Sequence, residues 1–233
     1  MDPITEAPKE NVRKPIGELD SEDIFEVYRF RGKFRTSVIG GIPADPEILE
    51  GHMLRKGKTA QEIETALAML EKTVELNTVE GATAVSTNVF YGDEKGIFIN
   101  DYQIIGMLKE VMQIQKSITS WRNKIQNGVR VSPQNIYLMR EGDYIETWDG
   151  FSQSVVHSEY MGRPQSSVKK MAYINNAEFE CEVWVGRDFS KAGGGKPIIN
   201  AEIMRKLLKH AQEIGLGAMR RMGNGKFDAE WVD

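Results

Sequence analysis

The sequence lacks most of the features that mark secreted and membrane proteins. Among its 233 residues Cys181 is the only cysteine, so no internal disulfide can form. No apolar run approaches the roughly 20 residues that a membrane-spanning helix needs. The first 15 residues, MDPITEAPKENVRKP, contain acidic residues and proline, unlike a signal or transit peptide. We therefore expect a cytoplasmic protein without disulfides and without a membrane partner.

Patterns that bind metals are equally scarce. The three histidines, His52, His157 and His210, lie far apart in the sequence, and there is no cysteine pair. Structural zinc sites use four cysteine or histidine ligands at short spacings, so we expect no metal and no other cofactor. His210 follows Lys209 on a predicted helix, where we expect it to face solvent. The lack of a positioned histidine also argues against an enzyme that uses a general base.

The net charge of −4 argues at first against a polyanionic partner, but the charge is unevenly distributed. Residues 1–26 contain eight acids and three bases, a net charge of −5, which leaves +1 for the rest of the chain. The cations of that remainder cluster in residues 29–35 and from Arg205 to Lys226. Such a chain can bind a phosphate backbone locally although its total charge is negative. The alternative is that the acidic end only keeps the protein soluble.

The pattern of apolar residues predicts one domain over residues 21–233, preceded by an extended acidic arm over residues 1–20. Helices are predicted after a T-x-x-E capping box at residues 59–62, from Asn100 or Asp101 to about residue 127, and from Asn200 to a stop at Gly215. Residues 37–51 are predicted to form a loop. Because strands and helices interleave on what we expect to be one sheet, we predict the α+β class, with α/β as the alternative.

Residues 24–35, IFEVYRFRGKFR, alternate apolar and basic side chains. This period of two predicts a strand whose aromatic residues face the core. Its outward face would carry four successive cations, whereas ordinary exposed strand faces mix both signs of charge. Those cations are Arg29, Arg31, Lys33 and Arg35. We expect them to follow the phosphates of a nucleic acid without encoding its sequence.

The most informative stretch is residues 215–227, GLGAMRRMGNGKF, between a predicted helix and a predicted strand. Its glycines surround Arg220 and Arg221. Glycine permits positive φ and close backbone approach, so amide N–H groups can face phosphate oxygens, and arginine adds planar donors. The order of residues differs from a P-loop, which needs G-x-x-x-x-G-K-S/T between a strand and a helix. The alternative is an ordinary loop with glycine turns.

The order helix, G-L-G-x-x-R-R-x-G-x-G-K-F and short final strand resembles the glycine-rich loop of the repeat-associated mysterious protein (RAMP) superfamily, whose members are subunits of CRISPR effector complexes. Residues 97–111, IFINDYQIIGMLKEV, are similar to the family's turn and following helix. They depart from it at Asn100 and Asp101, where proline-glycine is more usual. Residues 31–46, RGKFRTSVIGGIPADP, resemble the first strand and glycine loop of backbone subunits.

The resemblance implies a ferredoxin-like, RNA-recognition-motif-like sheet with insertions at about residues 52–80 and 149–171. It implies a backbone subunit of an antiviral ribonucleoprotein that lies along a guide RNA in multiple copies, with other effector subunits and a target DNA or RNA as further partners. Residues 149–171 are the candidate for a protruding hairpin that interrupts the bases, or alternatively a mobile surface loop. Besides the strand cations, the implied nucleic-acid-binding residues are Arg163, Lys169, Lys170, Gly217, Arg220, Arg221, Gly223, Gly225 and Lys226.

Catalysis has one candidate residue, which also comes from the resemblance. Some backbone subunits cut target RNA with an aspartate in the loop after the first strand, and Asp45 occupies that place. A proline-flanked aspartate is more often a turn residue, and no catalytic partner is visible beside it, so we expect no enzyme activity. Two alternatives remain open: a RAMP-type endoribonuclease that processes RNA, and a self-assembling structural protein of a phage or mobile element.

Overall fold

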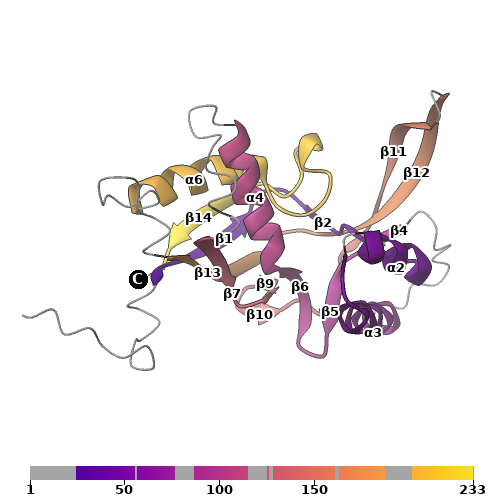
Figure 1. The fold of residues 1–233 in the computed structure, drawn as a ribbon, viewed down its shortest axis with the longest axis horizontal. Coiled ribbons are helices and arrows are strands. Elements are labelled where there is room, and N and C mark those ends of the chain that lie inside the picture. The colour runs from indigo at the N-terminus through magenta and orange to yellow at the C-terminus, as the bar shows by residue number, and fades with distance from the viewer. Residues whose placement is uncertain are drawn as a thin grey trace, which may run out of the picture.

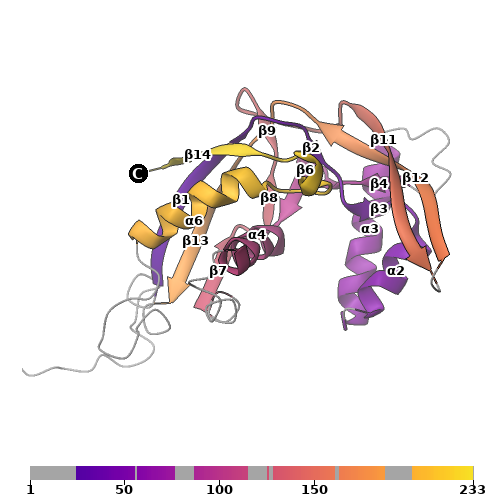
Figure 2. The ribbon, with the colours of Figure 1, turned by 90° about the horizontal axis from the view of Figure 1, so that it is seen from above.

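The protein is described by a computed structural model over residues 25–55, 57–76, 87–114, 125, 128–160, 163–186 and 201–232. It belongs to the α+β class, with mainly antiparallel sheets, as predicted. The described strands form three sheets that lie along an elongated molecule (Figures 1 and 2). None of the helices placed in these ranges is both long and apolar enough to cross a membrane.

The largest sheet comes from a series of elements in the order strand, helix, strand, strand, helix, strand. These are β1 (Phe25–Phe34), α4 (Asp101–Ile114), β7 (Val129–Ser132), β13 (Glu178–Gly186), α6 (Ala201–Ile214) and β14 (Phe227–Trp231). The four strands stand in the order β14, β1, β13, β7, and each neighbouring pair is antiparallel. Two short strands, β9 (Met139–Arg140) and β10 (Asp143–Tyr144), extend the sheet beside β13.

The predicted alternation along β1 is confirmed. Tyr28, Phe30 and Phe34 are buried, while Arg29, Arg31 and Lys33 are exposed. The partner strand β13 alternates in the same way, with Phe179, Cys181, Val183 and Val185 buried. One face of the sheet is therefore apolar and is covered by α4 and α6, which contact each other. The other face carries exposed charged side chains, and none of the described helices covers it, so we call it the open face.

Two smaller sheets and two helices follow the large sheet along the molecule (Figure 2). One sheet contains the long hairpin of β11 (Gly150–Tyr160) and β12 (Arg163–Ile174), together with β2 (Val38–Ile39), β3 (Ile42–Pro43) and β4 (Thr87–Val89). The other contains β5 (Tyr91–Asp93), β6 (Gly96–Asn100) and β8 (Asn135–Tyr137). The helices α2 (Pro46–Arg55) and α3 (Ala60–Leu76) pack against each other beside these strands. They lie with the β11–β12 hairpin at the far end of the molecule, whereas β6 and β8 lie beside α4.

The predicted loop over residues 37–51 is wrong in its second half, because α2 begins at Pro46. The Asp45 carboxylate accepts hydrogen bonds from the amides of Glu47 and Ile48, at 2.9 and 3.2 Å, and thereby caps the helix. An aspartate N-cap followed by proline at the first helical position is a recognised helix start. The sequence therefore contains a signal for this helix start, an aspartate followed by proline. The glycines that precede it favour a loop, which explains the wrong prediction.

The predicted helix boundaries that fall on described residues are confirmed. Thr59 and Glu62 form the capping box, with the Thr59 amide donating to the Glu62 carboxylate at 2.8 Å. Gly215 follows α6 with a φ of 81°, and its amide donates to the Ala211 carbonyl at 2.8 Å. The expected continuation of α4 from residue 115 to 127, and the cap at Asn200, lie mostly outside the described residues.

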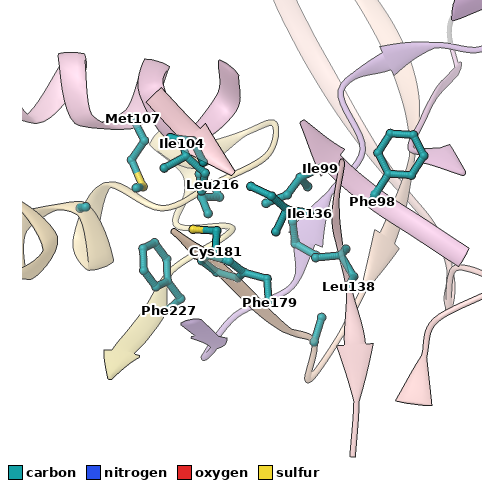
Figure 3. Packing of buried hydrophobic residues seen from close by; sticks show 14 of the residues in the cluster. Phe98, Ile99, Ile104, Met107, Ile136, Leu138, Phe179, Cys181, Leu216 and Phe227 are labelled. Carbon is teal, nitrogen blue, oxygen red and sulfur yellow. The ribbon is translucent and has the colours of Figure 1, made fainter. Parts of the chain in front are cut away.

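The core connects the large sheet, its two helices and the glycine-rich loop (Figure 3). Phe179 and Phe227 meet edge to face, with ring centroids 5.4 Å apart. Leu216, at the start of the loop, is buried in the same cluster as Met107 of α4. The loop is thus anchored in the core rather than laid over it. Burial also raises the pKa of the Cys181 thiol, which leaves this side chain unreactive.

Candidate nucleic-acid interface

The glycine-rich loop is fastened by its backbone to the segment that follows β1. The amides of Ala218 and Gly225 donate to the carbonyls of Ile39 and Ser37, at 2.9 and 2.8 Å. Within the loop the Leu216 amide donates to the Gly225 carbonyl at 2.9 Å. These three amides are therefore used inside the protein and are not available to phosphate. Their bonds hold the rest of the loop, including a short 3₁₀ turn at Arg220–Met222, in a fixed place.

Close approach explains the glycines at two loop positions. Gly225 has a φ of 73°, and a Cβ added there would lie 1.8 Å from the Leu216 carbonyl oxygen. Gly217 has a φ of 83°, and its added Cβ would lie 2.7 Å from the Ile39 carbonyl oxygen. Both positions need glycine because two backbone segments touch there. At these two positions, the packing of the loop explains why the residue is glycine.

Three cations at the loop, Arg35, Arg220 and Lys226, form ion pairs with carboxylates. The Arg220 guanidinium lies 2.8 Å from Glu110 of α4. Glu213 of α6 pairs through one oxygen with Arg35, at 2.6 Å, and through the other with Lys226, at 2.9 Å. Hydrogen bonds from Arg35 and Lys226 lower the pKa of Glu213 to about 2. Arg221 is exposed and forms no ion pair with any residue that the structure describes.

The hairpin of β11 and β12 contacts the glycine-rich loop close to the base of the hairpin. The hydroxyl of Ser154 in β11 lies 3.8 Å from the sulfur of Met222, which is exposed. Ser154 stands opposite Lys169 of β12, so alternation places Lys169 on the face of the hairpin that contacts the loop. Lys170 lies on the other face, with its ammonium 4.4 Å from the Phe151 ring centroid. Lys169, and not Lys170, therefore shares the face of the hairpin that contacts the glycine-rich loop.

The remainder of the hairpin projects away from the body of the molecule (Figure 1). Its strands pair in one continuous register from Gly150 opposite Tyr173 to Tyr160 opposite Arg163. This confirms the expected hairpin, whose two strands span residues 150–160 and 163–174. Val155 and Val168 face each other across it and are more than half exposed. The predicted contact of Arg163 with nucleic acid concerns a side chain that lies outside the described residues.

The outward cations of β1 lie on the open face of the sheet, and three of them are paired with acids of β13. Arg31 lies 3.1 Å from Glu180 and Lys33 lies 3.0 Å from Glu178, and Arg29 pairs with Glu182 in the same way. The outward face of β1 itself carries exposed cations, as predicted. Three of these four cations, however, form a ladder of ion pairs with the glutamates of β13. The fourth cation, Arg35, belongs to the loop cluster instead. The assignment of the other three to nucleic-acid binding stays a prediction.

Asp45 is the candidate for catalysis, and its carboxylate caps the N-terminus of α2 by accepting hydrogen bonds from two backbone amides. Among the described residues, no group of three histidine, cysteine, aspartate or glutamate side chains gathers into a possible metal site. The sequence analysis missed two residues that the structure places at the loop, Glu110 and Glu213. Glu110 belongs to α4, which is far from the loop in sequence, and Glu213 belongs to α6, which directly precedes the loop. No pattern in the sequence pairs them with particular cations.

Comparisons with known proteins identify no family for this chain. No protein-family model matches it, and no curated protein sequence matches it. Among solved structures, it is similar to a chain in the cryo-EM structure of the Type III-B Cmr-beta bound to cognate target RNA. The identity is 13%, the TM-score is 0.48, and the match covers 91% of this chain and 62% of that chain. This chain thus spans less than two thirds of that chain, and because the score is low we base the function on this chain's own residues.

Proposed function

We propose that this protein is a guide-RNA-binding backbone subunit of a CRISPR-type ribonucleoprotein effector, with a ferredoxin-like domain of the RAMP type. The strand–helix–strand–strand–helix–strand series, with the first strand between the third and the fourth, supports the domain assignment. Among the remaining elements, α2, α3 and the β11–β12 hairpin lie at or close to the two ranges that the sequence resemblance marks as insertions.

One observation carries the proposal: the glycine-rich loop and the hairpin, 68 residues apart in sequence, meet at the Ser154–Met222 contact. This contact would bring Lys169, which stands opposite Ser154, toward Arg220 and Arg221, beside a long projecting strand pair. Single-stranded nucleic acid is bound by cationic grooves that track the backbone, combined with elements that contact or separate the bases. The loop would supply the cations, and the hairpin would supply the projecting element.

Mass photometry on unstructured RNAs of increasing length tests this function. We expect the intact protein to add mass in regular steps as the RNA lengthens, because head-to-tail contacts generate open rows of subunits. Protein purified without nuclease should also carry protected RNA of regular length, visible as a high ratio of absorbance at 260 nm to that at 280 nm.

Other outcomes would contradict the proposal. A constant mass of one subunit per RNA would favour a solitary RNA-binding or processing protein. Small RNA products with defined ends would favour an endoribonuclease. Nucleic-acid-free oligomers would favour a structural assembly protein, in which the loop serves only packing.

A further inference from the structure

Two carboxylates from different helices reach the cations of the glycine-rich loop. Glu110 projects from α4 to the Arg220 guanidinium, and both side chains are only about one third exposed. Glu213 projects from the last turn of α6 and binds Arg35 and Lys226 with separate oxygens. The Glu110–Arg220 pair is partly shielded from water, so salt screens it less than the more exposed pairs of Glu213. Arg35, Arg220 and Lys226 therefore have carboxylate partners before any ligand arrives, whereas Arg221 has none among the described residues.

These carboxylates also reduce the charge of the interface. Besides Glu110 and Glu213, Asp228 lies 3.2 Å from Arg35. Three negative charges thus oppose four positive ones, leaving a net charge of +1. The four cations are Arg35, Arg220, Arg221 and Lys226. A phosphate that approaches Arg220 or Lys226 must displace a carboxylate or share the cation with it, and like charges at such short range repel each other.

Protonation does not relieve this repulsion at ordinary pH. The pKa of Glu213 is lowered to about 2 by its hydrogen bonds to Arg35 and Lys226, so it stays ionised. A competing anion or added salt is therefore what can free these cations. A polynucleotide can do so more effectively than an isolated anion, because it presents several phosphates together.

We propose that Glu110 and Glu213 are affinity-limiting residues, which hold the loop's cations in place and weaken the loop's own attraction for polyanions. The inference rests on the proposed function, since it assumes that single-stranded RNA reaches this loop. With the loop weakened in this way, stable binding depends on further contacts, from the hairpin or from a neighbouring subunit. The two glutamates would thereby reduce the retention of nucleic acids that engage the loop alone.

Three single substitutions with the same change in net charge test this role. Glu110→Gln and Glu213→Gln remove the restraining charges, and Glu202→Gln is the matched control. Glu202 lies on α6 and pairs with Lys206 at 2.8 Å, in the first turn of the helix and away from the loop. Affinity for an oligouridylate of about 30 nucleotides is measured by fluorescence anisotropy, from about 50 to about 300 mM salt. Thermal unfolding establishes that each variant is folded.

We expect Glu110→Gln and Glu213→Gln to bind about three- to tenfold more tightly at low salt, with a salt slope steeper by about 0.7 for each cation released. The control should change affinity less than about twofold, because general charge effects at a distance are screened. The gain of Glu110→Gln should vanish in an Arg220→Ala background. Equal gains in all three variants, or a gain that survives Arg220→Ala, would overturn the inference.

A failure of the proposed function would look different. If wild-type protein and Arg220→Ala bound the oligonucleotide equally, the loop would not be the interface at all. If Arg220→Ala weakened binding while Glu110→Gln and Glu213→Gln behaved as wild type, only the limiting role of the glutamates would be refuted.

Discussion

At the scale of single residues, the glycine-rich loop combines positions that serve packing with positions that face solvent. Gly217 and Gly225 are required by close backbone approach, and Leu216 is buried in the core. Arg221 and Met222 are exposed. Substitutions at the packing positions should therefore lower the stability of the fold. Substitutions at the exposed positions should instead change the binding of a ligand.

The first prediction concerns the two arginines. Arg220→Ala combined with Arg221→Ala should weaken binding to single-stranded RNA, with little change in stability, because both side chains lie outside the core. The salt slope should fall by about 0.7 to 1 for each phosphate that the variant no longer binds. Lys206→Ala combined with Lys209→Ala, on the exposed face of α6, removes the same charge and serves as the control. An unchanged affinity and salt slope in the folded double variant would contradict the assignment.

The second prediction compares two glycines that share a positive φ. Gly223→Ala introduces only the strain of the left-handed backbone, about 1–2 kcal/mol, because nothing lies within 4 Å of its added Cβ. Gly225→Ala adds a collision with the Leu216 carbonyl and should cost about 3–5 kcal/mol. Urea unfolding of both variants gives the difference. Equal decreases in stability would show that the loop backbone can move away.

The third prediction concerns pH. Because the pKa of Glu213 is lowered from 4.5 to about 2, its ion pairs stabilise the folded state fully above the unfolded-state pKa and lose that effect as the pH falls toward 2. Glu213→Gln should therefore be less stable than wild type near neutral pH, with a difference that shrinks between about pH 5 and about pH 2. Urea unfolding at several pH values measures it. A difference that does not vary with pH would mean that altered packing, and not charge, is responsible.

At the scale of elements, the β11–β12 hairpin consists of a base embedded in the fold and a part that projects from it. Met171 and Ala172 are buried at the base, whereas Val155 and Val168 are more than half exposed. Val155 and Val168 are also directly opposite each other, so the hairpin can be shortened there without a change of register. The projecting part is thus separable from the core.

The fourth prediction follows from that register. Deleting residues 155–168 and joining Ser154 to Lys169 with a short glycine-serine linker should leave a folded protein, because the deleted segment begins and ends at exposed positions. The shortened protein should no longer form long complexes on RNA in mass photometry, although the loop cations remain. Stepwise assembly that persists after the deletion would show that the hairpin does not join neighbouring copies or bind the RNA strand.

At the scale of the whole molecule, the charged residues divide between two surfaces. The loop cluster is joined to α4 and α6 through Glu110 and Glu213. The open face of the large sheet carries a separate ladder of ion pairs between β1 and β13. Such pairs near the surface contribute little to stability, so a polyanion that binds this face would have to compete with the glutamates for the cations.

The fifth prediction tests this open face. Arg29→Glu combined with Arg31→Glu should lower RNA affinity to the same extent for all sequences, if these cations contact the sugar-phosphate backbone. Binding to oligouridylate and to an unstructured RNA of mixed sequence, compared at equal salt, measures the effect. A changed sequence preference with intact affinity would contradict backbone contact. Unchanged binding to both RNAs would show that the ladder faces something other than RNA.

The sequence by itself determined the elements whose signals are local. The alternation of β1 and β13, the capping box of Thr59 and Glu62 and the stop at Gly215 depend only on neighbouring residues, and the structure has all of them. The signal for the start of α2, an aspartate cap followed by proline, is also local, although a loop is predicted there. These features were predictable because backbone geometry and burial act through fixed periods of two and 3.6 residues.

The tertiary structure decided which charges meet. The sequence placed four cations on one face of β1, but strand pairing set the glutamates of β13 beside three of them and directed Arg35 to Glu213. It also brought Ser154 to Met222 and Glu110 to Arg220. Ion pairs and loop contacts act through space at a few ångströms, between residues whose separation along the chain carries no pattern. Only the folded arrangement could therefore define this interface.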